Sequence, residues 1–374
     1  MPSYDAVVVG LGAVGSAAAY HLARQGWRVL GLDRFAPPHA HGSSHGGSRI
    51  IRRAYFEGQH YLPLLERAYT LWRTLEAEAG AALLHVAGGL HIGPAQGAVV
   101  QGALAAAEAQ GLDHALLDAA ATRARFPAFA PPEDHAALWE PGAGYLDPEA
   151  CIAAHLDAAR RHGADLRLAE PATAWACDGG GVRVTTAHGA YRAARLVLAA
   201  GGWTGALVPE LAAHLAVERQ VNAWFRPKAD VPFFAPARCP VYIWEQNDAA
   251  VFYGFPDTGA GVKAGLHHRG ALTDHPDALA RTVEPADVEA VRTPLVRLLP
   301  AAAGPLARAA VCFYTNTPDQ HYLVDHHPEH AAVVMASACS GHGFKASNVV
   351  GEALAALATG AAPAVDLSAF RWRW

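Results

Sequence analysis

The sequence predicts a two-domain α/β protein, in which a parallel sheet in one domain is combined with an antiparallel sheet in an inserted second domain. Three observations support this prediction. The chain opens with a strand, a helix and a second strand, and parallel strands require such a crossover. Its middle contains short alternating strands separated by turn residues, which is typical of an antiparallel sheet. Two later segments again have the apolar pattern of buried strands and are assigned to the first domain.

The opening unit follows from its residue types. Residues 4–9 (YDAVVV) are rich in β-forming side chains and predict a strand. Residues 10–15 interrupt this strand with glycines, residues 16–25 predict a helix, and Gly26 ends that helix. Residues 27–33 (WRVLGLD) are again apolar and predict the second strand. We therefore expect the two strands to be parallel neighbours.

The later elements follow from periodicity and turn residues. Residues 60–80 carry apolar side chains at helical spacing, and Gly80 supplies the end of that helix. Residues 191–201 predict a strand that ends in glycine. Residues 332–337 (AVVMAS) predict a buried strand, which a turn joins to a helix over residues 346–359. The predicted antiparallel strands of the middle are residues 83–93, 215–226, 241–255 and 261–268.

These patterns predict one domain that is built from separated stretches of the chain, with the other domain inserted between them. The stretches of the first domain are residues 1–82, 148–214 and 318–374. The stretches of the second domain are residues 83–147 and 215–317.

The composition narrows the class of protein. Of the 374 residues, 52% are hydrophobic and 17% are charged, which excludes a disordered chain. The formal net charge of −5 argues against a nucleic-acid partner. The five cysteines show no C-x-x-C spacing, which favours a reducing, cytoplasmic setting over a disulfide scaffold or a zinc ribbon. No apolar run is long enough to predict a membrane span.

Two groups of histidines suggest a metal site at first sight. Neither group has a cysteine or carboxylate at a known ligand spacing, so we expect no metal ion. The groups are His39, His41 and His45, and His326, His327 and His330.

The glycines after the first strand form a dinucleotide-binding motif. Gly10, Gly12 and Gly15 match G-x-G-x-x-G between a strand and a helix, and Asp33 ends the next strand. The first glycine permits a tight turn, the second lets the backbone approach a pyrophosphate, and the third lets the helix pack on the strand. The helix N-terminus favours phosphates, and Asp33 can accept hydrogen bonds from ribose hydroxyls. The motif predicts a dinucleotide without distinguishing NAD from FAD.

The loop after Asp33 carries the first of four blocks that point to one known family. Residues 41–52 (HGSSHGGSRIIR) resemble the signature loop of the monomeric sarcosine oxidase and N-methyltryptophan oxidase family. The other blocks are residues 253–256 (YGFP) leading to Lys263, residues 312–319 (CFYTNTPD) and residues 340–345 (SGHGFK). The resemblance spans the chain. It implies a glutathione-reductase-like FAD domain, a substrate domain with an antiparallel sheet, and a monomeric enzyme that oxidises secondary N-methyl amines.

The resemblance also implies how FAD is held. Cys312 would bind it covalently through its 8α-methyl group, although a buried cysteine is more often a small hydrophobic residue. The other residues implied in cofactor binding are Gly10, Gly12, Gly15, Asp33, Ser43, Ser48, Gly341, Gly343 and Phe344.

The substrate of such an enzyme carries a carboxylate, which needs a cationic partner. By resemblance, Arg52 and Lys345 supply the positive charges and Tyr314 also contacts the substrate. An arginine offers a fork that matches a carboxylate, and a lysine adds a point charge.

The implied catalytic residues lie around the flavin ring. Arg49 would stabilise negative charge on the ring, and Lys263 would lie at the face where oxygen reacts. Lys263, Gly265 and His267 alternate onto the same face of a predicted strand. The remaining implied catalytic residues are His45, Tyr253 and His267.

The predicted reaction removes a hydride equivalent from the carbon next to nitrogen. With oxygen and water, an N-methyl amino acid of the sarcosine or N-methyltryptophan type then gives the demethylated amino acid, formaldehyde and H2O2. Three alternatives remain open: an oxidase of a cyclic secondary amino acid such as pipecolate or proline, an NAD(P)-dependent Rossmann dehydrogenase, and a flavin-bearing protein without catalysis. Residues 241–246 (VYIWEQ) are expected to line the substrate pocket, but the direction of Trp244 stays open.

Overall fold

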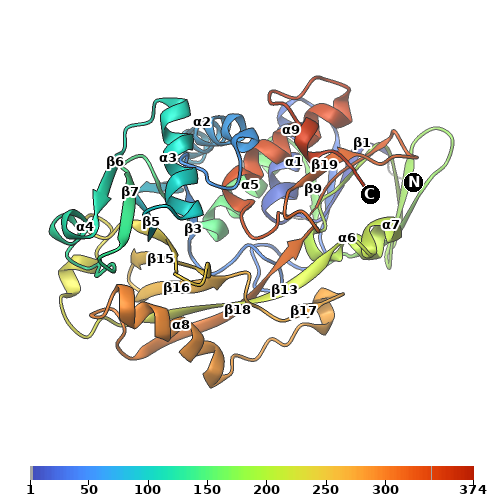
Figure 1. The fold of residues 1–374 in the computed structure, drawn as a ribbon. Helices are drawn as coiled ribbons and strands as arrows, with labels where there is room; N and C mark the ends of the chain where they lie inside the picture. The colour runs from blue at the N-terminus through green and yellow to red at the C-terminus, as the bar shows by residue number, and fades with distance from the viewer. Residues whose placement is uncertain (1–2, 338) are drawn as a thin grey trace.

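The computed structural model describes residues 3–337 and 339–374. Within these residues, the strands form one sheet of eight strands, one of nine and one of three. Figure 1 shows the eight-stranded sheet and its helices on one side of the molecule and the nine-stranded sheet on the other, with the long strands β13 and β18 running from one side toward the other. The mixture of a parallel and an antiparallel sheet confirms the predicted α/β class.

The eight-stranded sheet has a parallel centre. Its neighbours β9, β2, β1, β12 and β20 all pair in parallel. Strands β10, β11 and β19 extend it by antiparallel pairing. The strands are β1 (Ser3–Val9), β2 (Val29–Leu32), β9 (Asp165–Arg167), β10 (Ala172–Cys177), β11 (Val182–Thr186), β12 (Gly189–Leu198), β19 (Leu323–His326) and β20 (Val333–Ser337).

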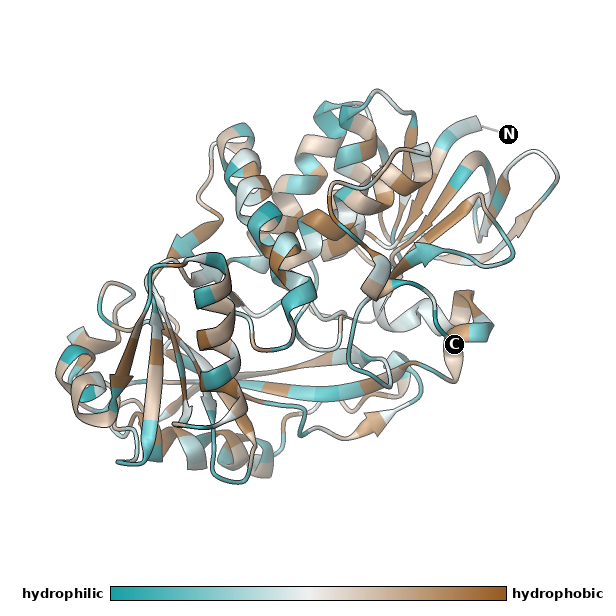
Figure 2. Cartoon of the chain, turned by 45° about the horizontal axis from the view of Figure 1, so that its top comes forward, coloured by the Kyte–Doolittle hydropathy of each residue, from teal (hydrophilic) through white to brown (hydrophobic). Residues whose placement is uncertain are grey.

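Helices cover the parallel centre of this sheet. The crossover helix α1 packs against α5 and α9, and α2 packs against α9 and α5. Figure 2 shows the apolar strands of the sheet beneath these helices. The helices of the structure are α1 (Ala13–Arg24), α2 (Leu62–Ala79), α3 (Ala98–Gln110), α4 (Ala119–Arg125), α5 (Pro148–Arg161), α6 (Thr204–Leu207), α7 (Pro209–Ala212), α8 (Pro285–Leu298) and α9 (Ser347–Thr359).

The elements predicted for this part of the chain are present. The strand–helix–strand unit has the expected order, with residues 6–9 paired in parallel to residues 29–32. Helix α2 ends at Gly80, whose φ of 64° is the left-handed conformation that favours glycine. The predicted strands 191–201 and 332–337 correspond to β12 and β20, and the predicted last helix corresponds to α9.

The nine-stranded sheet is antiparallel except where β14 pairs in parallel with β5. Its order is β17-β13-β16-β15-β14-β5-β7-β6, with β18 on the other edge of β13. Helix α8 packs against β13 and β16, and α3 packs against β5 and β7. The strands are β5 (Gly89–Pro94), β6 (Ala115–Asp118), β7 (His135–Glu140), β13 (Ala216–Phe225), β14 (Val241–Glu245), β15 (Val251–Asp257), β16 (Val262–His267), β17 (Leu272–Thr273) and β18 (Leu306–Asn316).

Two predicted strands of the middle are each two strands in the structure. Residues 83–93 break at Gly88, which has a φ of 74°, and contribute to two different sheets. Residues 241–255 form the hairpin β14–β15. The three-stranded sheet consists of β3 (Arg49–Ile51), β8 (Gly144–Leu146) and β4 (Leu84–Val86). The predicted domain boundaries themselves stay a prediction.

The length and hydropathy of the helices also bear on membrane insertion. Within residues 3–337 and 339–374, no helix is both long enough and apolar enough to cross a bilayer.

Candidate functional site

The glycine turn joins β1 to α1 and depends on close backbone contacts. Gly10 has a φ of 88°, and a Cβ there would lie 2.4 Å from the carbonyl oxygen of Ala199. A Cβ on Gly15 would lie 1.7 Å from the carbonyl oxygen of Gly10, so α1 packs on the turn only with a glycine. Around Gly12, by contrast, a Cβ would meet nothing within 4 Å. The backbone at Gly12 is therefore open to a ligand.

Asp33 lies directly after β2 and ties the turn to the end of that strand. Its Oδ2 accepts a hydrogen bond of 2.7 Å from the Leu11 N–H, and its Oδ1 accepts one of 2.7 Å from the Phe35 N–H. These two bonds hold the carboxylate at the edge of the cavity that begins at the glycine turn.

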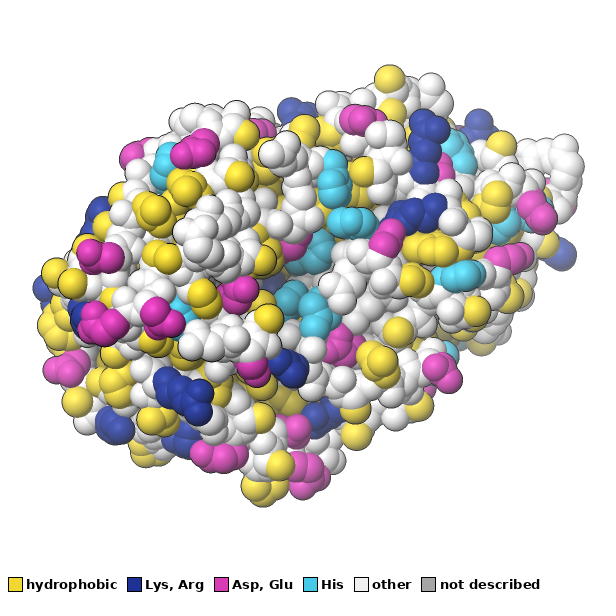
Figure 3. Space-filling view, in the orientation of Figure 1, with side chains coloured by type: hydrophobic (Ala, Val, Ile, Leu, Met, Phe, Trp, Pro, Cys, Tyr) yellow, Lys and Arg dark blue, Asp and Glu magenta, His cyan; other side chains and the backbone are white. Residues whose placement is uncertain are grey.

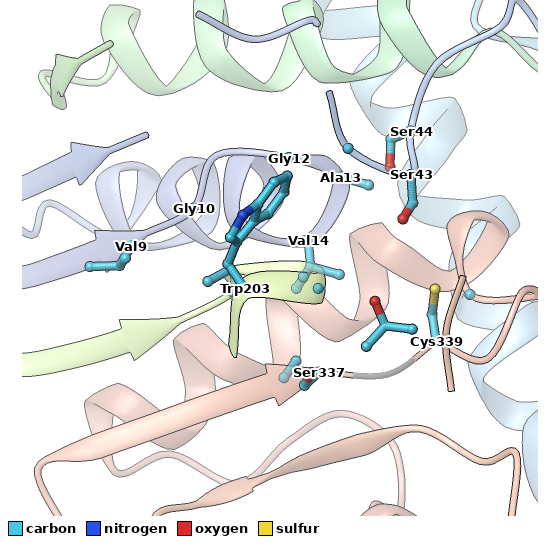
Figure 4. Close-up of a pocket in the computed structure, with 18 of the residues that line it drawn as sticks. Val9, Gly10, Gly12, Ala13, Val14, Ser43, Ser44, Trp203, Ser337 and Cys339 are labelled. Carbon is cyan, nitrogen blue, oxygen red and sulfur yellow. The ribbon is translucent and has the colours of Figure 1, made fainter. Parts of the chain in front are cut away.

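A cavity of about 550 Å³ starts at this turn. Its volume lies in the ordinary range for ligand sites, roughly 300–1,000 Å³. Figure 4 shows the ring of Trp203 beside Gly12 and Ala13, with the side chains of Ser43 and Cys339 facing the same space. From the turn, the cavity reaches residues far apart in the sequence, including Ser43, Arg49, Phe313, Tyr314, Gly341, Gly343 and Phe344.

A second cavity, of about 90 Å³, adjoins the first. Both cavities are lined by Arg49, Tyr314, Gly341 and Phe344. In Figure 3, histidine side chains gather around a recess near the middle of the molecule. The remaining residues that line the second cavity include Ser48, Ile50, Arg52, Phe56, Glu57, Asn222, Ile243, Val251, Tyr253, Phe255, His267, Cys312, His342 and Lys345.

At one end of the second cavity, Arg52 forms an ion pair with Glu57. Its Nη2 donates to both carboxylate oxygens, at 2.5 and 2.7 Å, and its Nη1 donates to the carbonyl of Ala54 at 2.9 Å. Burial raises the pKa of Glu57, but the charges of Arg52, His342 and Lys345 and the hydrogen bond from Arg52 together lower it more, and the net pKa falls to about 2. Sequence reasoning identified Arg52 but missed Glu57, and only its position five residues later hinted at the pairing.

Lys345 lies at the same end and is also buried. Its Nζ donates to the carbonyl of His342 at 2.5 Å and to the hydroxyl of Tyr55 at 3.4 Å. Burial, followed by the charge of Arg52, lowers the pKa of Lys345 to about 7. The ammonium charge of Lys345 is therefore sensitive to pH near neutrality.

The segment after Arg52 is fixed by buried Glu140, which lies at the end of β7 in the nine-stranded sheet (the second sheet). Its carboxylate accepts hydrogen bonds from the N–H groups of Arg53 and Ala54, at 2.8 and 3.1 Å. His91 lies 3.5 Å from the same carboxylate. The second sheet therefore holds the backbone that presents Arg52 to the cavity.

The lining of the second cavity also contains two tyrosines and a histidine. The hydroxyl of Tyr314 lies 3.1 Å from Nδ1 of His267. The hydroxyl of Tyr253 donates to Oδ1 of Asn222 at 3.0 Å. Burial raises the pKa of Tyr253 to about 12 and lowers that of His267 well below its usual range, so both groups are neutral at pH 7.

Lys263 lies beneath the loop of residues 42–48. Its Nζ donates to the carbonyls of Gly46 and Ser48, at 2.9 and 2.8 Å, and lies 3.2 Å from the Ser48 hydroxyl. Burial lowers the pKa of Lys263 well below its usual range, and the charge of Arg49 acts in the same direction. Neither Lys263 nor His45 is among the described residues that line the two cavities.

Arg49 and His45 belong to the same loop. Arg49 donates to the carbonyls of Ser48 and Ser43, at 2.7 and 2.6 Å, and so braces the loop across its width. His45 is buried, and this burial lowers its pKa to about 4.

The strand β14 was expected to line the substrate pocket. Of this segment, Ile243 lines the second cavity. Trp244 points into the core of the second sheet, where its ring contacts Phe252 edge-on. The direction of Trp244 is thus settled, and it is not a wall of the cavity.

The side chains that could bind a metal ion are spread over the described part of the chain. No group of three or more His, Cys, Asp or Glu side chains is arranged there to hold a metal ion.

The two adjoining cavities fit FAD as the dinucleotide that the motif requires. The first connects an open glycine turn to Tyr314 and Phe344, and the second begins there and contains Cys312. The cavity that opens at Gly12 therefore adjoins the cavity that Cys312 lines. If the chain were an NAD(P)-binding dehydrogenase, the position of Cys312 beside the dinucleotide cavity would have no explanation.

Comparison with known proteins agrees with this geometry. The sequence model of the FAD dependent oxidoreductase family, DAO, matches residues 5–357. A monomeric sarcosine oxidase from Streptomyces avermitilis is 43% identical over 361 residues, which cover 96% of this chain and 94% of that protein. An N-methyl-L-tryptophan oxidase from Salmonella typhimurium is 35% identical over 368 residues, which cover 98% of each chain.

Solved structures show the same fold. NikD, described as an unusual amino acid oxidase essential for nikkomycin biosynthesis, has a TM-score of 0.88 and 27% identity, over 99% of this chain and 98% of that one. A glycine oxidase from Geobacillus kaustophilus has a TM-score of 0.83 at 18% identity, over 100% of this chain and 99% of that one, and shows the fold alone. The resemblance carried by the four sequence blocks is confirmed. This chain belongs to the FAD dependent oxidoreductase family, in the group of the monomeric sarcosine oxidases and N-methyl-L-tryptophan oxidases.

Proposed function

We propose that this chain is an oxidase that demethylates a small N-methyl amino acid of the sarcosine type. It converts the amine, oxygen and water into the demethylated amino acid, formaldehyde and H2O2. The names of its relatives support this reaction type. The observation that carries the proposal is the second cavity, whose lining combines the cations Arg52 and Lys345 with neutral Tyr253, His267 and Tyr314. The proposal also holds that the enzyme acts as a monomer in the cytoplasm.

The size of the second cavity supports a small substrate. Its volume of about 90 Å³ is well below the roughly 300–1,000 Å³ of ordinary ligand sites. Phe56, Ile243 and Val251 close its apolar side. An indole side chain needs additional room, so sarcosine fits this cavity better than N-methyltryptophan.

The charges in the cavity support a division of roles among its residues. FAD, when bound, accepts the hydride equivalent from the carbon next to nitrogen. Arg52 and Lys345 hold the carboxylate of the substrate at one end. Because burial keeps His267 neutral, this side of the cavity presents hydrogen-bonding groups to the amine and adds no further cation. Lys263, beneath the loop, serves the oxygen reaction.

The proposed reaction is tested by its two products. With sarcosine, the purified protein should produce H2O2 and formaldehyde in equal amounts, and N-methyl-L-tryptophan should react more slowly because of its size. A peroxidase-coupled assay and a formaldehyde assay measure both. Peroxide from L-proline without formaldehyde would favour the cyclic alternative. A yellow protein that yields no peroxide with any of these amines would contradict an oxidase.

The covalent link to FAD is tested at Cys312. Acid precipitation of the purified protein should leave the yellow colour in the pellet, because the 8α-carbon is bonded to Sγ. Cys312→Ser should release the colour into the supernatant. Cys239 is also buried and lies in the core of the second sheet, so Cys239→Ser should keep the colour in the pellet. Free flavin from the unchanged protein would rule out the link.

The carboxylate clamp is tested by binding of a small carboxylate that lacks the amine. Arg52→Gln or Lys345→Met should weaken its binding by about 10- to 150-fold, because a hydrogen bond to a charged group is worth about 1.5–3 kcal/mol. Arg53→Gln is the matched control, since Arg53 points to Glu66 and Tyr69 instead of the cavity. Spectral titration of the flavin measures the affinity. Equal affinities in the Arg52 and Lys345 variants and in the control would place the clamp elsewhere.

The same clamp predicts a pH dependence with a definite sign. The pKa of Lys345 is lowered to about 7, and a bound carboxylate raises it again. The contribution of the ammonium group is therefore complete below about pH 7 and is lost as pH rises through the pKa of the complex. Titrations between pH 6 and 9 should show weakening affinity at the alkaline end, and Lys345→Met should remove this slope. An unchanged slope in Lys345→Met would assign it to another group.

The role of Lys263 is tested by separating the two halves of the reaction. Lys263→Met should keep reduction of the flavin by sarcosine without oxygen, because Arg49 and Glu149 still hold the loop. Reoxidation by oxygen should slow by orders of magnitude, since a buried cation at a developing anion is worth several kcal/mol. Stopped-flow absorbance measures both steps, with exposed Lys228 changed to Met as the control. Slow reduction with fast reoxidation would instead make Lys263 a substrate residue.

A further inference from the structure

Asn222 lies in the second cavity between Cys312 and Tyr253, although no sequence block contains it. Only 3% of its surface is exposed. Its Nδ2 donates to Sγ of Cys312 at 3.3 Å, and its Oδ1 accepts from the Tyr253 hydroxyl at 3.0 Å. Both ends of this buried amide are therefore bonded, and the bond from Tyr253 directs the N–H end toward the sulfur.

The sheet itself builds this contact. Asn222 on β13 lies opposite Gly265 on β16, and Gly265 lies opposite Tyr253 on β15. A Cβ on Gly265 would lie 2.7 Å from the Tyr253 hydroxyl, so the missing side chain lets Tyr253 reach across to Asn222. On the other side, Cys312 pairs with residue 220, which puts it on the same face as Asn222.

The chemistry of the sulfur gives this contact a purpose. A thiolate reacts as a nucleophile, whereas a thiol does not. An N–H donor that points at Sγ stabilises the negative charge of the thiolate. Asn222 makes this contact directly. The titratable groups whose pKa responds to a charge on Cys312 are Tyr253, Tyr314, Lys263 and Arg281, and Arg281 is a cation.

We propose that Asn222 is a positioning residue for covalent attachment of FAD, and that its N–H group directs Sγ of Cys312 at the cofactor and stabilises the negative charge that forms on the sulfur during attachment. This inference rests on the proposed link at Cys312. In the attachment, a bond forms between Sγ and the 8α-carbon of FAD. The thiol proton and one methyl proton leave, and two electrons pass to the flavin. Oxygen then removes these electrons and is reduced to H2O2.

The test measures the rate of attachment. Full-length apoprotein made under riboflavin limitation is mixed with FAD, and the flavin that precipitates with the protein in acid is followed over time at several pH values. Asn222→Leu removes the N–H donor without adding a charge. Asn222→Asp keeps the acceptor for Tyr253 and replaces the donor with an oxygen. The control, Gln220→Leu, changes another buried amide of β13, whose Nε2 donates to Glu218 and not to the sulfur.

We expect attachment at pH 7 to slow by about tenfold or more in both Asn222 variants, because a hydrogen bond to a charged group is lost. In Asn222→Leu, the rate should recover as pH rises, since the thiolate then forms without help. Gln220→Leu should attach FAD at nearly the unchanged rate. Fluorescence quenching on mixing reports non-covalent FAD binding, and Asn222→Asp decides the question if Asn222→Leu does not bind FAD.

Three results separate the possible failures. Unchanged rates and pH profiles in both Asn222 variants would overturn the inference. A loss that Gln220→Leu shares, and that higher pH does not restore, would assign Asn222 to packing and also overturn it. If the unchanged protein never retains flavin in acid, the proposed link at Cys312 is wrong, which is a distinct failure from that of Asn222.

Discussion

The arrangement of the site depends on one buried lysine that ties the two halves of the molecule together. Lys263, on a strand of the nine-stranded sheet, donates to the carbonyls of Gly46 and Ser48 in the loop that follows the dinucleotide motif. From the other half, Glu149 at the start of α5 accepts from the N–H groups of Gly46 and Gly47. A buried amine is costly unless its hydrogen bonds are made, and this loop supplies them. These hydrogen bonds hold the loop in one position. Arg49 and Arg52 come shortly after these loop residues in the sequence, so the same bonds set where they meet the cavities.

Sequence patterns predicted the parts of the fold that depend on residues close together in the sequence. The glycine spacing at Gly10, Gly12 and Gly15 fixes a turn whose backbone atoms nearly touch, so its structure follows from a few residues. Helix α2 ends at Gly80 because a left-handed residue is needed there. The alternation of residues 263, 265 and 267 follows from strand geometry.

The remaining features of the fold and the site depend on contacts between strands that are far apart in the sequence. No local sequence pattern predicts such contacts. Asn222 meets Cys312 only because β13 pairs with β18 in one register, across 90 residues of sequence. A single asparagine in a strand predicts no such partner. The break at Gly88 was missed for a similar reason, since a short alternating run does not say that its halves join different sheets. Glu57 belongs to none of the four sequence blocks, and only the fold shows that it pairs with Arg52.

The pairing of Arg52 with Glu57 changes what the cations of the second cavity can do. Together these two side chains carry no net charge, so Arg52 alone does not make its end of the cavity attractive to a second carboxylate. A substrate carboxylate beside Glu57 would be repelled unless further positive charge is present. Lys345 supplies that charge when it is protonated, at the same end of the cavity. The affinity for an amino acid therefore depends on the lysine more than on the arginine, whose two Nη groups already donate to Glu57 and Ala54.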